Sequence, residues 1–145
     1  MLRFYIKLVF TYCCVIFYLS QVFGYAPSKA YFFENENFLP WHEAEEFCNK
    51  KGMHLFTISN EGDHLFLKNF IQQKYNRLLP YWTGAYKVSN TFTWHSTGEP
   101  IKYFIWHENE PNDKSGDERC IHTWENDFDW NDNDCIVRLP FICEI

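Results

Sequence analysis

The chain has 145 residues and a mass of 17.6 kDa, a length that fits one domain better than two. Aromatic residues make up 21% of the chain, which excludes the composition of a disordered protein. The formal net charge of -6 argues against a nucleic-acid backbone as the partner.

The first 24 residues have the layout of a secretory signal peptide. Arg3 and Lys7 give a basic start, an apolar run follows from Leu8 to Leu19, and Gly24 is a small residue suited to cleavage. The alternative is an uncleaved membrane anchor, since no charge occurs from Leu8 to Ser28, but polar residues dilute the second half of that stretch. We therefore expect a signal peptide over residues 1–24 and a secreted mature domain over residues 25–145, with no stable membrane span after cleavage.

Four cysteines remain once this leader is removed, namely Cys48, Cys120, Cys135 and Cys143. An even number in a chain bound for an oxidising compartment predicts two disulfides. Spacing alone leaves three connectivities open. A zinc site is disfavoured because no C-x-x-C pair is present in the mature chain.

The first half of the mature chain predicts two helices and two short strands. Residues 29–33 form the first strand, a helix begins at Pro40-Trp41, and residues 54–58 form the second strand. Asn60 is a typical N-cap for a second helix, which Pro80 ends. The predicted apolar faces contain Trp41, Ala44, Phe47 and Cys48 in the first helix and Leu67, Phe70, Ile71 and Tyr75 in the second.

The second half of the chain predicts short strands that alternate with turns, over residues 81–86, 91–94, 102–106, 119–124 and 138–143. Helices followed by strands indicate an α+β domain with an antiparallel sheet. Residues 107–118 have little apolar content and no periodicity, so we expect a long loop of functional importance.

Ten of the nineteen acidic residues fall within positions 108–134, where only two basic residues accompany them and leave a local net charge of -8. Like charges at this density repel one another, so either the segment is solvated or a cation lies within it. The acidic residues are Glu108, Glu110, Asp113, Asp117, Glu118, Glu125, Asp127, Asp129, Asp132 and Asp134.

Oxygen-bearing side chains gather at two places in this segment: Glu110-Pro111-Asn112 followed by Glu118, and Asn131-Asp132. Carboxylate and amide oxygens suit Ca²⁺, which takes about six to eight oxygen ligands in flexible geometry. Neutral amides lower the ligand charge and leave positions for external oxygens such as sugar hydroxyls. An amide also donates a hydrogen bond to a hydroxyl while a carboxylate accepts one.

Other interpretations of the acidic segment explain fewer residues. A solvated acidic loop is the simplest alternative, because charge runs are usually solvated. An EF-hand that begins at Asp127 fails because Asp132 stands where that loop needs glycine. The six histidines are scattered and no base–nucleophile pair is recognisable, which disfavours an enzyme.

Four motifs in order resemble the C-type lectin domain family over residues 31–144. They are the helix with its cysteine (WHEAEEFC, residues 41–48), the strand YWTGA (residues 81–85), the triplet Glu110-Pro111-Asn112, and a C-terminal signature from Trp130 to Glu144. The resemblance implies the C-type lectin-like fold, with two helices flanking antiparallel sheets, a long calcium-binding loop and two disulfides. It pairs Cys48 with Cys143 and Cys120 with Cys135.

The resemblance also implies a function and its residues. The Ca²⁺ ligands, which also bind the sugar, would be Glu110, Asn112, Glu118, Asn131 and Asp132, with the Asp132 carbonyl as a further ligand and a cis bond before Pro111. In the family, the triplet E-P-N accompanies mannose-type sugars: mannose, N-acetylglucosamine and fucose. The chain would then be a secreted, calcium-dependent lectin without enzymatic activity, with glycans as its partners and with no defined oligomeric state.

One departure from the family pattern qualifies this picture. Lys87 and Arg119 stand where many members place acids of an auxiliary Ca²⁺ site, so we expect that site to be lost and one of these cations to pair with Asp113.

Most tryptophans are expected in the core, whereas a ligand contact for Trp124 or His122 stays open. The alternative function is a protein-binding module with vestigial sugar binding.

Overall fold

The computed structural model describes residues 29–145. The predicted signal peptide, residues 1–24, lies outside this range, so both its cleavage and the boundary of the mature domain stay predictions. Residues Tyr31–Ile145 form one compact unit. None of the helices in the described range combines the length and the apolar character needed to cross a membrane.

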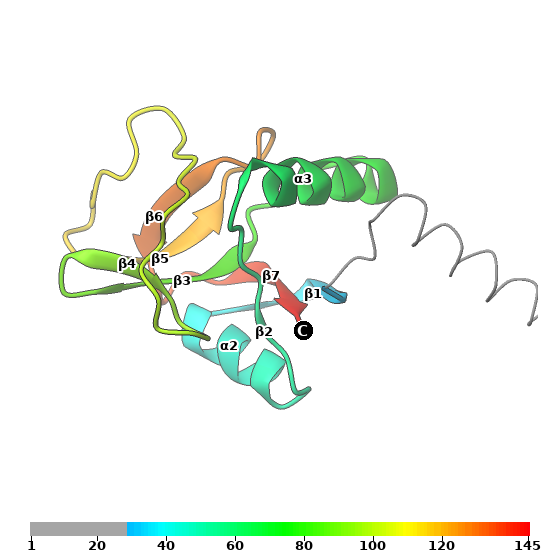
Figure 1. Ribbon diagram of the computed structural model, residues 1–145, viewed down its shortest axis with the longest axis horizontal. Helices are drawn as coiled ribbons and strands as arrows, with labels where there is room; N and C mark the ends of the chain where they lie inside the picture. The colour runs from blue at the N-terminus through cyan, green and yellow to red at the C-terminus, as the bar shows by residue number, and fades with distance from the viewer. Residues whose placement is uncertain (1–28) are drawn as a thin grey trace, which may run out of the picture. The chain divides into compact units, whose positions relative to one another are not determined.

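The described chain folds into two helices and a mixed sheet, which confirms the predicted α+β class (Figure 1). The strands run in the order β1-β7-β3-β5-β6, with β2 added to β7 and β4 added to β3. Neighbouring strands are antiparallel except β3 and β7, which are parallel where Trp82 lies opposite Phe141. The elements are β1 (Tyr31–Leu39), α2 (Trp41–Asn49), β2 (His54–Leu55), α3 (Glu61–Tyr75), β3 (Trp82–Val88), β4 (Thr91–Trp94), β5 (Glu118–Thr123), β6 (Trp130–Asp134) and β7 (Leu139–Glu144).

Both helices begin where local chemistry predicts. Helix α2 begins at Trp41, directly after Pro40. Helix α3 is capped by Asn60, whose Oδ1 accepts a hydrogen bond from the backbone N–H of Asp63 at 3.0 Å. It ends at Tyr75, because Asn76 adopts a left-handed conformation with φ of 53°. The prediction that Pro80 ends this helix is therefore wrong.

Several strand predictions differ from the structure. Strand β1 covers Tyr31–Leu39, where residues 29–33 were expected, and β2 covers only His54–Leu55, where residues 54–58 were expected. The expected strand over residues 102–106 is absent, because that stretch pairs only through an isolated bridge between Trp106 and Trp130. Its alternating burial is nevertheless strand-like: Tyr103 and Ile105 pack on the core while Phe104 is exposed. Strand β6 was not among the predicted strands, because its sequence WNDND is almost entirely polar.

The core has two parts, one around helix α3 and one around helix α2. In the first, Leu67 and Ile71 of α3 pack against Phe56, Phe128 and Trp130. In the second, three residues of α2 pack against β3 and β7; they are Trp41, Ala44 and Cys48. Trp41, Trp82, Trp94 and Trp130 are all buried, as expected of core tryptophans.

Two disulfides link elements of the described chain, in the pairing that the family resemblance implies. Cys48–Cys143 joins α2 to β7, and Cys120–Cys135 joins β5 to the residue that follows β6. In the loop-entropy model such closures stabilise the folded state by about 3 to 5 kcal/mol each. The second disulfide holds together the two strands that carry the predicted ligands Glu118, Asn131 and Asp132.

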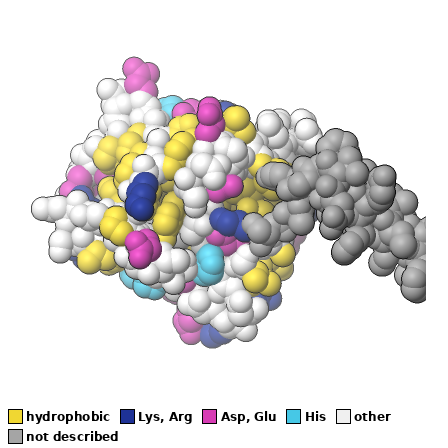
Figure 2. Space-filling model, in the orientation of Figure 1, with side chains coloured by type: hydrophobic (Ala, Val, Ile, Leu, Met, Phe, Trp, Pro, Cys, Tyr) yellow, Lys and Arg dark blue, Asp and Glu magenta, His cyan; other side chains and the backbone are white. Residues whose placement is uncertain are grey.

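The segment between β4 and β5, residues 95–117, contains no helix and no strand of the sheet. Figure 1 shows its yellow part arching beyond the ends of β5 and β6. The predicted long loop over residues 107–118 is therefore present and begins earlier than expected. On the face shown in Figure 2, acidic side chains are distributed among apolar ones and do not form one patch.

We predict that Gly84→Ala destabilises the domain. A Cβ at Gly84 would lie 2.7 Å from the carbonyl oxygen of Leu55, and both backbones are fixed by the hydrogen bond from Gly84 N to Phe56 O at 2.8 Å. Overpacking of this kind costs about 1–3 kcal/mol. Urea unfolding measures the loss, and an unchanged midpoint would contradict the close approach of β3 to the segment after β2.

Candidate metal and ligand site

The floor of the candidate site is formed by polar residues of β5 and β6. Glu118 begins β5, and Asn131 and Asp132 lie on β6, which pairs with β5 in antiparallel register. Their exposed fractions are 7%, 9% and 1%, low values for residues that are usually solvated. Buried charges of this kind need compensating partners.

The rim of the site is formed by the loop. Glu110 is half-buried and Asn112 is exposed. The side-chain nitrogen Nδ2 of Asn112 donates to Glu110 Oε1 at 2.9 Å. The Glu110–Pro111 bond is cis, as the resemblance implies. Four of the five predicted ligands therefore come together from loop, β5 and β6, and Asn131 lies beside Asp132 on the same strand.

Successive backbone N–H groups of the loop bind the floor carboxylates. Asp132 accepts from Asn112 N at 3.0 Å and from Asp113 N at 3.1 Å. Glu118 accepts from Lys114 N at 2.9 Å and from Ser115 N at 3.2 Å. Each carboxylate oxygen has two lone pairs, so these bonds attach the loop to the sheet and leave acceptor capacity for a cation.

Negative charge is concentrated where loop and floor meet. Asp113, Glu118 and Asp132 each offer an oxygen within 4.8 Å of the others, a spacing that one cation can bridge. Glu110 Oε2 is buried and has no hydrogen-bond partner among residues 29–145. Burial raises the pKa of Glu110, and the neighbouring carboxyls of Asp132 and Glu118 raise it further. A bound cation would relieve both the repulsion and the unsatisfied oxygen.

His122 fixes the orientation of the Asn131 amide. The carbonyl of Thr123 can only accept, so His122 Nδ1 donates to it at 2.8 Å and Nε2 is left as an acceptor. Asn131 Nδ2 therefore donates to His122 Nε2 at 2.9 Å, and the same nitrogen donates to the carbonyl of Asp132 at 2.7 Å. This arrangement turns Asn131 Oδ1 to the opposite side of the amide, where it is available to a cation.

His122 is neutral in this arrangement, since burial lowers its pKa to about 4. Its exposed fraction of 6% places it beneath the site, not on the surface that a ligand reaches. The sequence left a ligand contact for His122 open and missed its positioning role. The strand register that sets His122 opposite Asn131 was the missing information.

The cations near the site have separate partners. Lys87 Nζ lies 3.9 Å from Asp113 Oδ2, which confirms the predicted pairing of one cation with Asp113. Arg119 instead pairs with Asp117 at 3.5 Å. Loss of the auxiliary Ca²⁺ site stays a prediction, and the ammonium on Asp113 supports it because a cation cannot ligate a metal ion.

Comparison with known proteins identifies close sequence relatives. Residues 38–145 match the family described as "Lectin C-type domain". The chain is 29% identical over 125 residues to lectin subunit alpha of Sarcophaga peregrina, covering 80% of this chain and 44% of that protein. It is 32% identical over 125 residues to salivary C-type lectin 2 of Aedes albopictus, covering 79% of this chain and 82% of that protein. The chain thus spans less than half of the first relative.

Solved structures with the same fold include both sugar-binding and other proteins. The C-type lectin domain of murine dendritic cell inhibitory receptor 2, solved in complex with N-glycan, matches with a TM-score of 0.70 and 25% identity, over 83% of this chain and 93% of that one. A calcium-independent type II antifreeze protein matches with a TM-score of 0.70 and 25% identity, over 83% and 88% of the two chains.

We predict that His122→Phe weakens cation binding by about 10–100-fold, as removal of groups that orient metal ligands generally does. The variant removes the acceptor that orients Asn131, while the aromatic ring maintains packing against Trp82, whose ring centroid lies 5.7 Å from that of His122. Calorimetric titration with Ca²⁺ measures the effect. His122→Gln supplies a new acceptor and should bind more tightly than His122→Phe, whereas wild-type affinity in a folded His122→Phe protein would exclude the positioning role.

Proposed function

The chain belongs to the C-type lectin domain family, and we propose that it is a secreted, calcium-dependent lectin that binds mannose-type sugars. Domains of this family are non-enzymatic modules that bind carbohydrate. The observation that carries the proposal is the convergence of buried Glu118 and Asp132 with Glu110, whose Oε2 lacks a hydrogen-bond partner in the described chain.

The donor set fits a hard divalent cation. Three carboxylates and two amides would hold Ca²⁺, namely Glu110, Asn112, Glu118, Asn131 and Asp132. The ion would supply positive charge and open coordination positions. The chain orients the ligands through hydrogen bonds. His122 accepts from the Asn131 amide, and backbone N–H groups of the loop donate to the carboxylates of Asp132 and Glu118.

The same side chains suit a sugar with adjacent hydroxyls. The side-chain amide of Asn112 has a second N–H, beyond the one bound to Glu110 Oε1, that can donate to a hydroxyl oxygen, and the carboxylates of Glu110 and Glu118 accept from hydroxyl protons. In the family, the order E-P-N accompanies mannose-type sugars, so we propose mannose, N-acetylglucosamine and fucose as ligands. The glycan complex of the murine receptor domain, at 25% identity, supports glycans as the partner class.

Secretion is part of the proposal. A leader over residues 1–24 and a mature domain over residues 25–145 would place the two disulfides in an oxidising compartment, where such bonds persist. The salivary relative from Aedes albopictus supports this placement.

A second candidate is a lectin-like module that needs no cation and binds a protein or another surface. Backbone amides already bind both floor carboxylates, and Lys87 already lies against Asp113, so part of the charge is compensated without a metal ion. The similar calcium-independent antifreeze protein shows that the fold accommodates such a state. The buried Glu110 oxygen favours the calcium-dependent candidate.

We predict that mannose-agarose retains the full secreted chain in Ca²⁺ and releases it in chelator. The double variant Glu110→Gln with Asn112→Asp exchanges the donor and acceptor on the rim, so its retention should move toward galactose resin. Asp117→Asn, an exposed loop residue outside the ligand set, serves as the matched control and should behave as wild type. Unchanged preference in the double variant would refute the site assignment.

Calcium stabilisation should decline with acid. Because the pKa of Glu110 is raised in the metal-free protein, its ionised form destabilises that protein, and this cost disappears as the pH falls through the raised pKa. Protons and Ca²⁺ also compete for the same oxygens. The increase in melting temperature that Ca²⁺ causes should therefore shrink from about pH 7.5 to about pH 5.

Thermal unfolding with and without Ca²⁺ at each pH measures this change. Glu110→Gln should remove most of the calcium effect at every pH, while Glu108→Gln, an exposed neighbour in the loop, should retain it. A calcium-induced increase that is constant across this pH range would argue against Glu110 as a ligand.

A further inference from the structure

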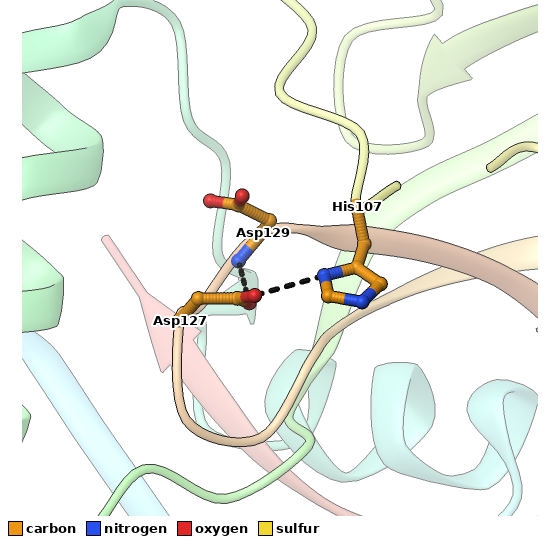
Figure 3. Close-up of side chains that lie close together, drawn as sticks. All are labelled: His107, Asp127 and Asp129. Carbon is orange, nitrogen blue, oxygen red and sulfur yellow. Dashed lines mark hydrogen bonds and ion pairs between the residues drawn. The ribbon is translucent and has the colours of Figure 1, made fainter. Parts of the chain in front are cut away.

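We propose that His107, Asp127 and Asp129 form a second metal site, suited to Zn²⁺ and separate from the calcium site. These residues each offer a ligand atom, and the three atoms lie within 4.8 Å of one another. Figure 3 shows His107 on the loop and the two aspartates on the turn that leads into β6. The exposed fractions of their side chains are 30%, 36% and 28%, so the group is reachable from solvent and partly shielded from it.

The contacts within the group orient its ligand atoms. His107 Nδ1 lies 2.8 Å from Asp127 Oδ2. The other oxygen, Asp127 Oδ1, accepts from the backbone N–H of Asp129 at 3.0 Å, which fixes the carboxylate with Oδ2 toward the imidazole. A metal ion that takes the place of the shared proton would therefore find a nitrogen and an oxygen already facing each other.

His64 places a second imidazole beside the group. This histidine of α3 is only 2% exposed, and its Nδ1 has no hydrogen-bond partner in the described part of the chain. Its Nε2 faces Asp129 Oδ1 at 3.8 Å, which is beyond hydrogen-bond distance. Nε2 is therefore the ring nitrogen that an ion held by Asp129 could reach, while Nδ1 points elsewhere.

The donor types select the metal. Imidazole nitrogen with carboxylate oxygen is a ligand combination typical of Zn²⁺, which three protein ligands hold with one position left open. Ca²⁺ prefers oxygen alone, and this distinguishes the group from Glu110, Asn112, Glu118, Asn131 and Asp132. His64, if drawn toward Asp129, would complete a set of two imidazoles and two carboxylates.

The surroundings hold the ligands in place. The His107 ring stacks on Trp124 with centroids 4.6 Å apart and an interplanar angle of 4°. The backbone N–H of His107 also donates to the carbonyl of Trp130 at 2.9 Å, which attaches the loop to β6. Trp124 in turn stacks on His122 at 6.3 Å, so the ring stack ends at the residue that orients the calcium ligand Asn131. Zn²⁺ and Ca²⁺ must therefore be titrated together as well as separately.

The test is calorimetric titration of the full secreted chain with Zn²⁺ in millimolar Ca²⁺, followed by visible absorption with Co²⁺ as a spectroscopic probe. We expect one saturable Zn²⁺ site per chain and cobalt absorption bands of a low-coordinate nitrogen–oxygen site. His107→Gln and Asp129→Asn should each weaken Zn²⁺ binding by about tenfold or more, since even groups that only orient ligands contribute that much.

Two controls make the result decisive. His42→Gln, an exposed histidine of α2, should bind Zn²⁺ as the wild type does, which excludes non-specific histidine binding. Glu118→Gln should lose Ca²⁺ and retain Zn²⁺, so failure of the calcium site is distinguishable from failure of this one. No saturable binding, binding unaffected in folded His107→Gln protein, or equal loss in His42→Gln would each overturn the proposal. Should Asp129→Asn not fold, His107→Gln alone decides.

Discussion

Compensation of the buried carboxylates of Glu118 on β5 and Asp132 on β6 is the constraint on which the rest of the site depends. Glu118 and Asp132 are almost completely buried, and ions in such surroundings must be paired or hydrogen-bonded. The loop meets part of this requirement with four successive backbone N–H groups. Glu110 adds another negative charge on the rim, where Oε2 finds no donor in the described structure. The negative charge that these hydrogen bonds leave uncompensated is the physical reason for inferring a cation.

The sheet and the disulfides give the long irregular loop a fixed position. Residues 95–117 contain no ladder that would fix their path, yet three of the proposed ligands lie on paired strands beneath them. The Cys120–Cys135 disulfide joins β5 to the residue after β6, and Cys48–Cys143 joins α2 to β7, which pairs with β1, β2 and β3. The loop is thus bound to a rigid floor at the positions where the chemistry is proposed, as expected when functional loops are positioned by a scaffold.

The parts of the fold that sequence could predict are those with local causes. Asn60 begins α3 because its side chain caps the helix, and this needs no distant neighbour. Residues 102–106 have the alternation of a strand but meet β6 only through the bridge between Trp106 and Trp130. Strand β6 is polar yet pairs with β5, so both outcomes depend on tertiary neighbours. The positioning of Asn131 by His122 and the approach of His64 to Asp129 depend likewise on register and on packing between elements. Neither can be recognised from spacing along the chain.

The most direct test of the calcium-dependent account is a crystal structure of the mature chain grown in Ca²⁺. The account predicts an ion between the rim and the floor, bound by side-chain oxygens of Glu110, Asn112, Glu118, Asn131 and Asp132, at distances of about 2.3–2.6 Å. Electron density that shows no ion there, with the backbone amides of residues 112–115 still donating to Asp132 and Glu118, would contradict it.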